Sequence, residues 1–187
     1  MIKNEWEKKR KVLTDYNETA THYDCRYNKE QKAKYSTALG KCDLNQEKML
    51  LDIGCGTGLF IKIISKKVLH IVGIDFSLTM LKIARLRCKP FNNVTLICCD
   101  ADYLPFKEES FDSIFSFTLL QNLPDPYKVL GEITRIAKNL SIVVITNMKK
   151  NRSYLEVFKM ISESDMEIIE SINLNSLEDN IFICTTK

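Results

Sequence analysis

The residues best suited to binding chemistry are a glycine-rich stretch and the acids that follow apolar segments. The stretch Gly54–Gly58 (GCGTG) comes directly after the apolar segment KMLLDI, which contains Asp52. Glycines at such a position allow a tight turn and let a ligand approach the main chain closely. The free N–H groups at the start of a following helix favour an anionic or polar group. A plain tight turn is the alternative, but the acid just before the glycines favours a binding loop.

Two further acids end apolar segments later in the chain. Asp75 closes the segment VLHIVGI, and Asp100-Ala101 closes the segment NVTLICC. A carboxylate about 20 residues beyond a glycine loop is well placed to accept both hydroxyls of a ribose. A carboxylate beside a backbone N–H suits the edge of an adenine. Ordinary helix-start and loop acids are the alternatives, but three strand ends in series favour one crevice for a nucleoside-containing ligand.

The elements that must position these residues alternate between strands and helices. Residues 2–40 have helical periodicity that ends at Gly40. We expect helices at 59–67, 77–88, 127–138 and 152–163, with Ser77 as a helix cap. We expect strands at 48–53, 68–74, 93–99, 111–118, 140–146, 167–174 and 180–186.

This alternation predicts βαβ units and a mostly parallel sheet, with ligands binding at the carboxyl ends of the strands. The last two strands have only a short connection, which predicts an antiparallel hairpin. With no linker or repeat in the sequence, we expect a single domain over residues 1–187, made of a helical cap (1–40) and a core (41–187).

The motifs resemble those of class I S-adenosylmethionine-dependent methyltransferases, and small archaeal members most of all. The resemblance covers about residues 20–147, and its motifs read, in chain order, DIGCGTG from Asp52, GIDFS from Gly73, DADYLPF from Asp100 and SFDSI from Ser110. It implies an α/β fold, a three-layer α/β/α sandwich. The sheet would have seven mostly parallel strands with the last antiparallel, plus N-terminal helices.

The resemblance also implies a role for each site residue. It assigns Asp52, Gly54, Cys55, Gly56 and Gly58 to the methionine part of S-adenosylmethionine. It assigns Asp75 to the ribose hydroxyls, Phe76 to the adenine ring, and Asp100 and Ala101 to the adenine edge, with Asp102 as a further cofactor-binding residue. It sets residues 116–121, among them Ser116, Phe117 and Gln121, beside the methyl group, and Tyr23 as a residue that closes over the cofactor. The product would be S-adenosylhomocysteine.

The catalytic residues and the acceptor are less defined. Gln121 and Tyr23 are the candidate catalytic residues, and His22, Tyr23, Asp102 and Asp125 are possible general bases. Neither the His-His of many small-molecule relatives nor the Asn-Pro-Pro-Tyr of many amino-group methyltransferases is present. A nicotinamide enzyme fits less well, because the third glycine comes one residue too early for a dinucleotide loop. No metal site is expected.

Three functions stay open. The leading one is methylation of a tRNA, an rRNA or a translation-related protein, with a small zinc-ribbon activator as a possible partner. The second is methylation of a small metabolite. The third is a non-catalytic S-adenosylmethionine-binding subunit that scaffolds a partner.

Composition limits the compartment and the partners. The 187 residues are 45% apolar with a net charge of +3, and no apolar run approaches the ~20 residues that span a bilayer. There is no signal peptide, and the seven cysteines form no CxxC pair, so we expect a cytoplasmic protein with mostly buried thiols and no membrane contact. Residues 1–159 carry an excess of eight bases, which would suit RNA, although interleaved acids favour a solvated surface.

Overall fold

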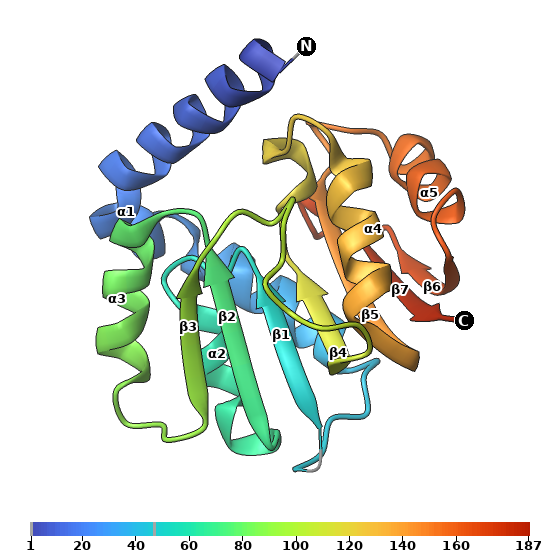
Figure 1. Cartoon of the computed structure of the whole chain (residues 1–187), viewed down its shortest axis with the longest axis horizontal. Coiled ribbons are helices and arrows are strands. Elements are labelled where there is room, and N and C mark those ends of the chain that lie inside the picture. Colours follow the sequence, from blue (N-terminus) through green and yellow to red (C-terminus); the bar gives the residue numbers. More distant parts are fainter. Residues whose placement is uncertain (1, 47) are drawn as a thin grey trace.

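The computed structural model describes residues 2–46 and 48–187, and these form a central seven-stranded sheet with helices on both faces (Figure 1). The strand order is β3-β2-β1-β4-β5-β7-β6. The strands are β1 (Met49–Ile53), β2 (His70–Asp75), β3 (Val94–Cys98), β4 (Phe111–Ser116), β5 (Ala137–Met148), β6 (Met166–Ile172) and β7 (Asp179–Thr186). The helices are α1 (Ile2–Leu39), α2 (Leu59–Ile64), α3 (Leu78–Cys88), α4 (Pro126–Ile136) and α5 (Tyr154–Ser162), with short 3₁₀ turns η1 (Ser65–Lys67) and η2 (Leu120–Asn122).

The sheet has the topology that the sequence predicts. Strands β1 to β5 pair in parallel with their neighbours, whereas β7 is antiparallel to both β5 and β6. The expected hairpin of the last two strands and the antiparallel final strand are therefore confirmed. Because β1, β2 and β3 run in the same direction, the segments that follow them meet at one edge of the sheet.

Two hydrophobic clusters cover the two faces, which confirms the three-layer sandwich. One cluster packs α4 and α5 against the sheet, for example through Ile133 and Val157. The other packs α2, α3 and the end of α1 on the opposite face, for example through Phe60, Leu81 and Ala38. Side chains from the central strands fill both layers.

Most differences from the predicted elements lie at their ends. The helix expected at 59–67 is shorter and ends in the 3₁₀ turn η1. The helix expected from 127 begins one residue earlier, because Pro126 fits a first helical position and Asp125 caps it. Strand β5 begins earlier than expected and passes through Leu140, which has a positive φ of 59°. Ser77 caps α3 as predicted, by accepting a hydrogen bond from the N–H of Met80.

The N-terminal segment forms a single helix, α1, and not several. The two halves of α1 run in different directions (Figure 1). The first half crosses the carboxyl ends of the strands, and the second half lies behind the sheet (Figure 1). None of the helices in the described residues has the length and apolar character needed to cross a membrane.

The expectation of mostly buried thiols was wrong. Only three of the seven cysteines are buried, Cys55, Cys88 and Cys184. The second histidine, His70, begins β2, and its Nε2 lies 2.9 Å from the hydroxyl of Thr95 near the surface. His70 and Thr95 belong to the outer part of the sheet, where the start of β2 and the edge strand β3 stay partly exposed.

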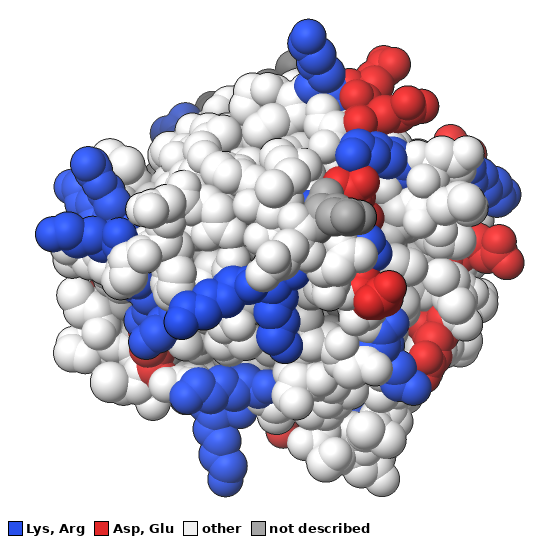
Figure 2. Space-filling model, turned by 90° about the horizontal axis from the view of Figure 1, so that it is seen from below, with Lys and Arg blue, Asp and Glu red and all other residues white. Residues whose placement is uncertain are grey.

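One face of the molecule lies away from the loops that follow β1, β2 and β3. Figure 2 views the protein from this side, at the amino ends of the parallel strands. Lys and Arg side chains are spread over the face, and most of its acids lie on the right of the view among further basic side chains. The excess of bases is thus at least partly on a face remote from those loops.

A buried ion pair joins the second half of α1 to the sheet. Nζ of Lys34 lies 2.7 Å from Oδ2 of Asp179, and both side chains are only 1% exposed. The Lys34 ammonium also donates to the hydroxyl of Thr118, which lies in the loop after β4. Removing one partner of a buried pair leaves the other charge uncompensated, which is costly.

We therefore expect Lys34→Met to lower the free energy of unfolding by about 3–5 kcal/mol, because Asp179 stays buried without its cation. Urea unfolding measures this change. Lys32→Met is the matched control, since Lys32 is exposed on the same helix and should change stability by less than about 0.5 kcal/mol. Similar small effects for both variants would contradict the structural role of the pair.

Candidate functional site

The glycine loop after β1 turns sharply and leaves one face open. Gly54, Gly56 and Gly58 have φ values of 76°, 53° and 73°, which side chains rarely adopt. A Cβ on Gly56 would meet nothing within 4 Å, so the main chain there faces open space. A Cβ on Gly58 would lie 3.1 Å from Cβ of Ala84, so this glycine serves close packing against α3. The loop thus offers its main chain at Gly56 and is fixed by packing at Gly58.

Asp75 connects this loop to the start of α3. Its Oδ2 accepts a hydrogen bond from the N–H of Gly56 at 2.8 Å, and its Oδ1 accepts one from the N–H of Ser77 at 2.8 Å. Burial raises the pKa of Asp75, and these two hydrogen bonds act in the opposite direction. The carboxylate is therefore held in one orientation at the edge of the cleft.

Asp52 lies beneath the loop and not on its surface. The residue is 2% exposed, and among the described residues its Oδ2 has no hydrogen-bond partner. Burial, together with the nearby charge of Asp75, raises the pKa of Asp52 to about 8. A cation close to this pair of acids would favour the ionised form of both.

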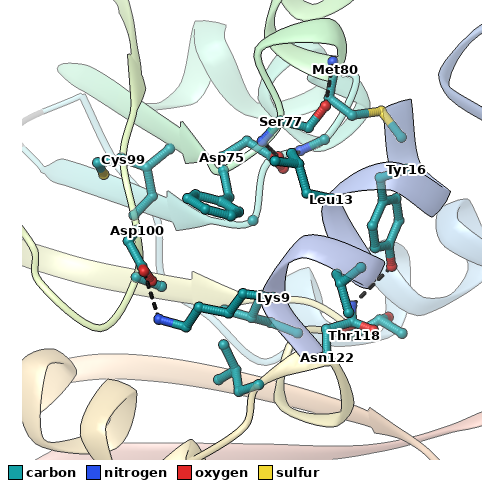
Figure 3. A pocket seen from close by; sticks show the side chains of 18 of the residues that line it. Lys9, Leu13, Tyr16, Asp75, Ser77, Met80, Cys99, Asp100, Thr118 and Asn122 are labelled. Carbon is teal, nitrogen blue, oxygen red and sulfur yellow. Dashed lines mark hydrogen bonds and ion pairs between the residues drawn. The ribbon is translucent and has the colours of Figure 1, made fainter. Parts of the chain in front are cut away.

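Asp100 and Asp102 follow β3 and share a cation from α1. Nζ of Lys9 lies 2.6 Å from Oδ2 of Asp100 and 2.5 Å from Oδ2 of Asp102. Asp100 lines the cleft, whereas Asp102 is 5% exposed and lies behind it. Figure 3 displays Lys9 reaching across the cleft to Asp100.

Together these elements enclose one cleft at the carboxyl edge of the sheet. Eight of the predicted site residues line it: Tyr23, Gly54, Gly56, Asp75, Phe76, Asp100, Ala101 and Phe117. Five others are buried and do not line the cleft themselves: Asp52, Cys55, Gly58, Asp102 and Ser116. Their roles as direct cofactor contacts stay predictions.

Sequence reasoning missed the contribution of the first half of α1. The lining includes Lys9, Leu13 and Tyr16 of this helix, which Figure 3 shows around the cleft, and also Val12. The apolar periodicity of this helix is a signal for an inward-facing stripe, but it does not say what the stripe covers. No sequence pattern marks Lys9, because its partners lie about ninety residues away in the chain.

A second hollow adjoins the cleft. It has a volume of about 590 Å³ and contains Gln121, together with residues of α1 and of the segment after β5. Five residues line both spaces and form the partition between them: Val12, Tyr16, Tyr23, Thr118 and Asn122. The hydroxyl of Tyr16 accepts a hydrogen bond of 2.9 Å from the amide of Asn122, which fixes one side of the partition (Figure 3).

The loop after β4 is strained where it meets the partition. Thr118 has a φ of 57°, which is unfavourable for a β-branched residue, and such strain concentrates at functional sites. Its hydroxyl pairs with Lys34, and its carbonyl accepts a hydrogen bond of 2.8 Å from Gln121. The predicted catalytic residue Gln121 is therefore tied to this loop, with its side chain in the second hollow.

Of the four possible bases, only two lie beside the hollow. His22 is exposed at its rim, and Tyr23 is in the partition. Burial raises the pKa of Tyr23 well above its usual value, so its hydroxyl remains protonated and does not act as a base at neutral pH. Asp102 lies at the far end of the cleft with Lys9, and Asp125 caps α4 by accepting from the N–H of Tyr127.

A further contact ties α1 to the glycine loop. The guanidinium of Arg87 on α3 pairs with Asp24 and donates to the carbonyl and the hydroxyl of Thr57, at 2.6 and 2.7 Å. The hydroxyl of Thr57 in turn donates to Asp24 at 2.7 Å. The predicted Tyr23-Asp24 motif thus holds α1 against the loop through Asp24, while Tyr23 faces the cleft.

Comparison with known proteins identifies the family. The family described as "Methyltransferase domain" matches residues 51–145. Malonyl-[acyl-carrier protein] O-methyltransferase of Marinomonas sp. is 30% identical over 144 residues, which are 76% of this chain and 53% of that protein. Demethylmenaquinone methyltransferase of Tropheryma whipplei is 34% identical over 109 residues, 58% of this chain and 45% of that protein. The chain spans about half the length of these curated relatives.

Among solved structures, a Haloferax volcanii methyltransferase in complex with the activator Trm112 has a similar fold. Its TM-score is 0.78 with 16% identity, covering 91% of this chain and 96% of that one. At this identity the likeness supports the fold alone. The matched family, the glycine loop and the sheet topology agree, and the chain belongs to the class I S-adenosylmethionine-dependent methyltransferases.

Proposed function

We propose that this chain binds S-adenosylmethionine in the cleft and transfers its methyl group to an acceptor in the second hollow. The observation that carries the proposal is the shared partition: Tyr16, Tyr23 and Thr118 border both spaces. A methyl donor on one side and a nucleophile on the other would meet there. Methyl transfer needs such a meeting point, because the nucleophile, the carbon and the leaving sulfur must lie in line.

The residues of the cleft fit this cofactor. Asp75 offers a fixed carboxylate for the ribose hydroxyls, and the open main chain at Gly56 admits a ligand close to the loop. The buried acid Asp52 lies beside Asp75, and a cationic ligand bound there would favour its ionised form over the protonated form that burial favours. Phe76 and Ala101 would flank the adenine, and Asp100 would accept its amino group.

Catalysis would then rest mainly on positioning. The bound cofactor supplies an electrophilic methyl group on a sulfonium, so a strong base is not required. Holding two reactants in line is worth up to ~7–11 kcal/mol. The partition fixed by the Tyr16–Asn122 hydrogen bond would orient the acceptor, and Gln121 would bind it in the hollow. His22 at the rim is the residue suited to accept a proton from the acceptor.

A small molecule is the acceptor that the geometry supports best. The hollow of about 590 Å³ lies within the roughly 300–1,000 Å³ of small-molecule sites. The relatives that match this chain include a methyltransferase named for demethylmenaquinone. The basic face of Figure 2 lies at the opposite end of the sheet, so it gives no support to an RNA held at the hollow.

A macromolecule of the translation apparatus is the second candidate. It is favoured by the similar fold of the Haloferax volcanii methyltransferase that is bound to an activator. Such an acceptor would insert one nucleotide or side chain into the hollow, and a zinc-ribbon activator would be the expected partner. The third possibility, a non-catalytic cofactor-binding subunit, predicts binding without transfer.

Incubation with methyl-labelled S-adenosylmethionine and separate metabolite, RNA and protein fractions distinguishes these functions. We expect labelled product in the metabolite fraction. Label confined to RNA or protein would favour the second candidate and reject the first. Cofactor binding with no labelled product in any fraction, even beside an added activator, would indicate a scaffold and reject transfer.

The role of Asp75 predicts a loss of cofactor affinity in Asp75→Asn. Removing a charged acceptor of two hydroxyls should weaken binding of S-adenosylhomocysteine by about 1.5–3 kcal/mol, or roughly 10- to 150-fold. Calorimetry measures the change, and Asp43→Asn on the exposed loop before β1 is the control. Equal affinity in wild type and Asp75→Asn would remove Asp75 from the site.

The raised pKa of Asp52 predicts a pH-dependent stability. The folded protein holds this proton up to about pH 8, whereas the unfolded chain loses it near pH ~3.9. The contribution of Asp52 to the free energy of unfolding therefore falls as the pH rises from about 4 to about 8. Relative to Asp52→Asn, wild type should lose up to about 1.4 kcal/mol per pH unit in urea unfolding over this window. A constant difference between the two proteins from pH 5 to pH 8 would show that Asp52 titrates normally.

A further inference from the structure

Lys9 makes the most shielded ion pairs at the mouth of the cleft. Its ammonium binds both Asp100 and Asp102, and its side chain is 10% exposed while that of Asp102 is 2% exposed. Shielded pairs of this kind are screened by salt less than exposed ones. Lys9 is the only lysine of α1 that the described contacts connect to these two acids.

Both carboxylate oxygens of Asp100 already have partners. Oδ1 accepts a hydrogen bond of 3.1 Å from the N–H of Asp102, and Oδ2 accepts from Lys9 at 2.6 Å. A carboxylate has about four acceptor positions, so these two bonds alone do not exclude the amino group of an adenine. Lys9, however, lines the cleft and reaches across it to Oδ2 of Asp100 (Figure 3), so Lys9 and an adenine compete for the space beside this oxygen.

The cleft is also too small for an adenosyl ligand while α1 lies over it. The space left in it is about 110 Å³, well below the roughly 300–1,000 Å³ of small-molecule sites. The same helix adds Leu13 and Tyr16 (Figure 3), as well as Val12, to its lining. Nearby, Lys8 holds the carbonyl of Leu123 at 2.6 Å. A ligand of adenosyl size requires the first half of α1 to move outward.

We propose that Lys9 is a built-in competitor of the cofactor at Asp100, which holds α1 closed in the ligand-free protein and is displaced by the adenine. The proposal rests on the proposed function, because it takes Asp100 as the carboxylate that faces the adenine. Lys9 thereby limits how fast the cofactor binds. It lines the cleft but not the second hollow.

The chain carries its own reporter of this exchange. Trp6 is its single tryptophan, and Nζ of Lys9 lies 5.7 Å from the centroid of the Trp6 ring. Displacement of Lys9 changes the charge near the indole and moves the helix that carries it. Tryptophan fluorescence therefore reports the release of α1 without any label.

The test is stopped-flow fluorescence with S-adenosylhomocysteine, whose net charge is zero, on the full chain. Lys9→Met should raise the association rate constant on the order of tenfold, because the charge-assisted hydrogen bonds that hold the helix are gone. Lys9→Arg keeps a cation and should stay near the wild-type rate. Lys11→Met is the matched control, since Lys11 is exposed on the same helix, and it should bind at the wild-type rate.

Calorimetry with the same ligand gives a readout that does not depend on tryptophan, and Lys9→Met should bind more tightly than wild type. An unchanged or slower rate in Lys9→Met, or weaker binding, would overturn the competition. Absence of ligand binding in every variant and in wild type would overturn the proposed function as well, whereas binding with equal rates throughout would overturn the role of Lys9 alone.

Discussion

The site depends on the parallel alignment of β1, β2 and β3. Because these strands end at one edge, the glycine loop, Asp75 and Asp100 lie in a row although they are far apart in the chain. Hydrogen bonds from Gly56 and Ser77 to Asp75 then link the first loop to the second. Without the shared direction of the strands, none of these residues would face the same ligand.

The helix α1 lines the part of the cleft that the loops after the strands leave open. Its second half is anchored in the core by Ala38 and by the buried pair of Lys34 with Asp179. Its first half adds none of its described residues to the two hydrophobic clusters and lies over the cleft with polar contacts, among them those of Lys9 and Tyr16, beside the apolar side chains of Val12 and Leu13. Elements held by few buried apolar contacts open at lower cost than the core. The first half of α1 is therefore a wall of the acceptor hollow, and it also covers the cleft until the cofactor displaces it.

Much of this arrangement was predictable from the sequence. Alternating apolar strands and helices gave the parallel sheet and the final hairpin, and the acids after β2 and β3 were expected in the cleft where they now lie. What could not be predicted depends on contacts distant in the chain. Lys9 has no motif, Tyr16 looks like any core residue of an amphipathic helix, and the burial of Asp52 beneath the loop follows from packing that no spacing reveals.

The central claim is that the row from Gly56 through Asp75 to Asp100 holds an adenosyl cofactor with its sulfur at the partition. A crystal structure of the chain with S-adenosylhomocysteine tests it most directly. The account predicts the ribose on Asp75, the adenine on Asp100, the sulfur beside Tyr16 and Thr118, and Lys9 released. A ligand bound elsewhere, or a cleft still filled by the side chains of α1 at saturating ligand, would contradict it.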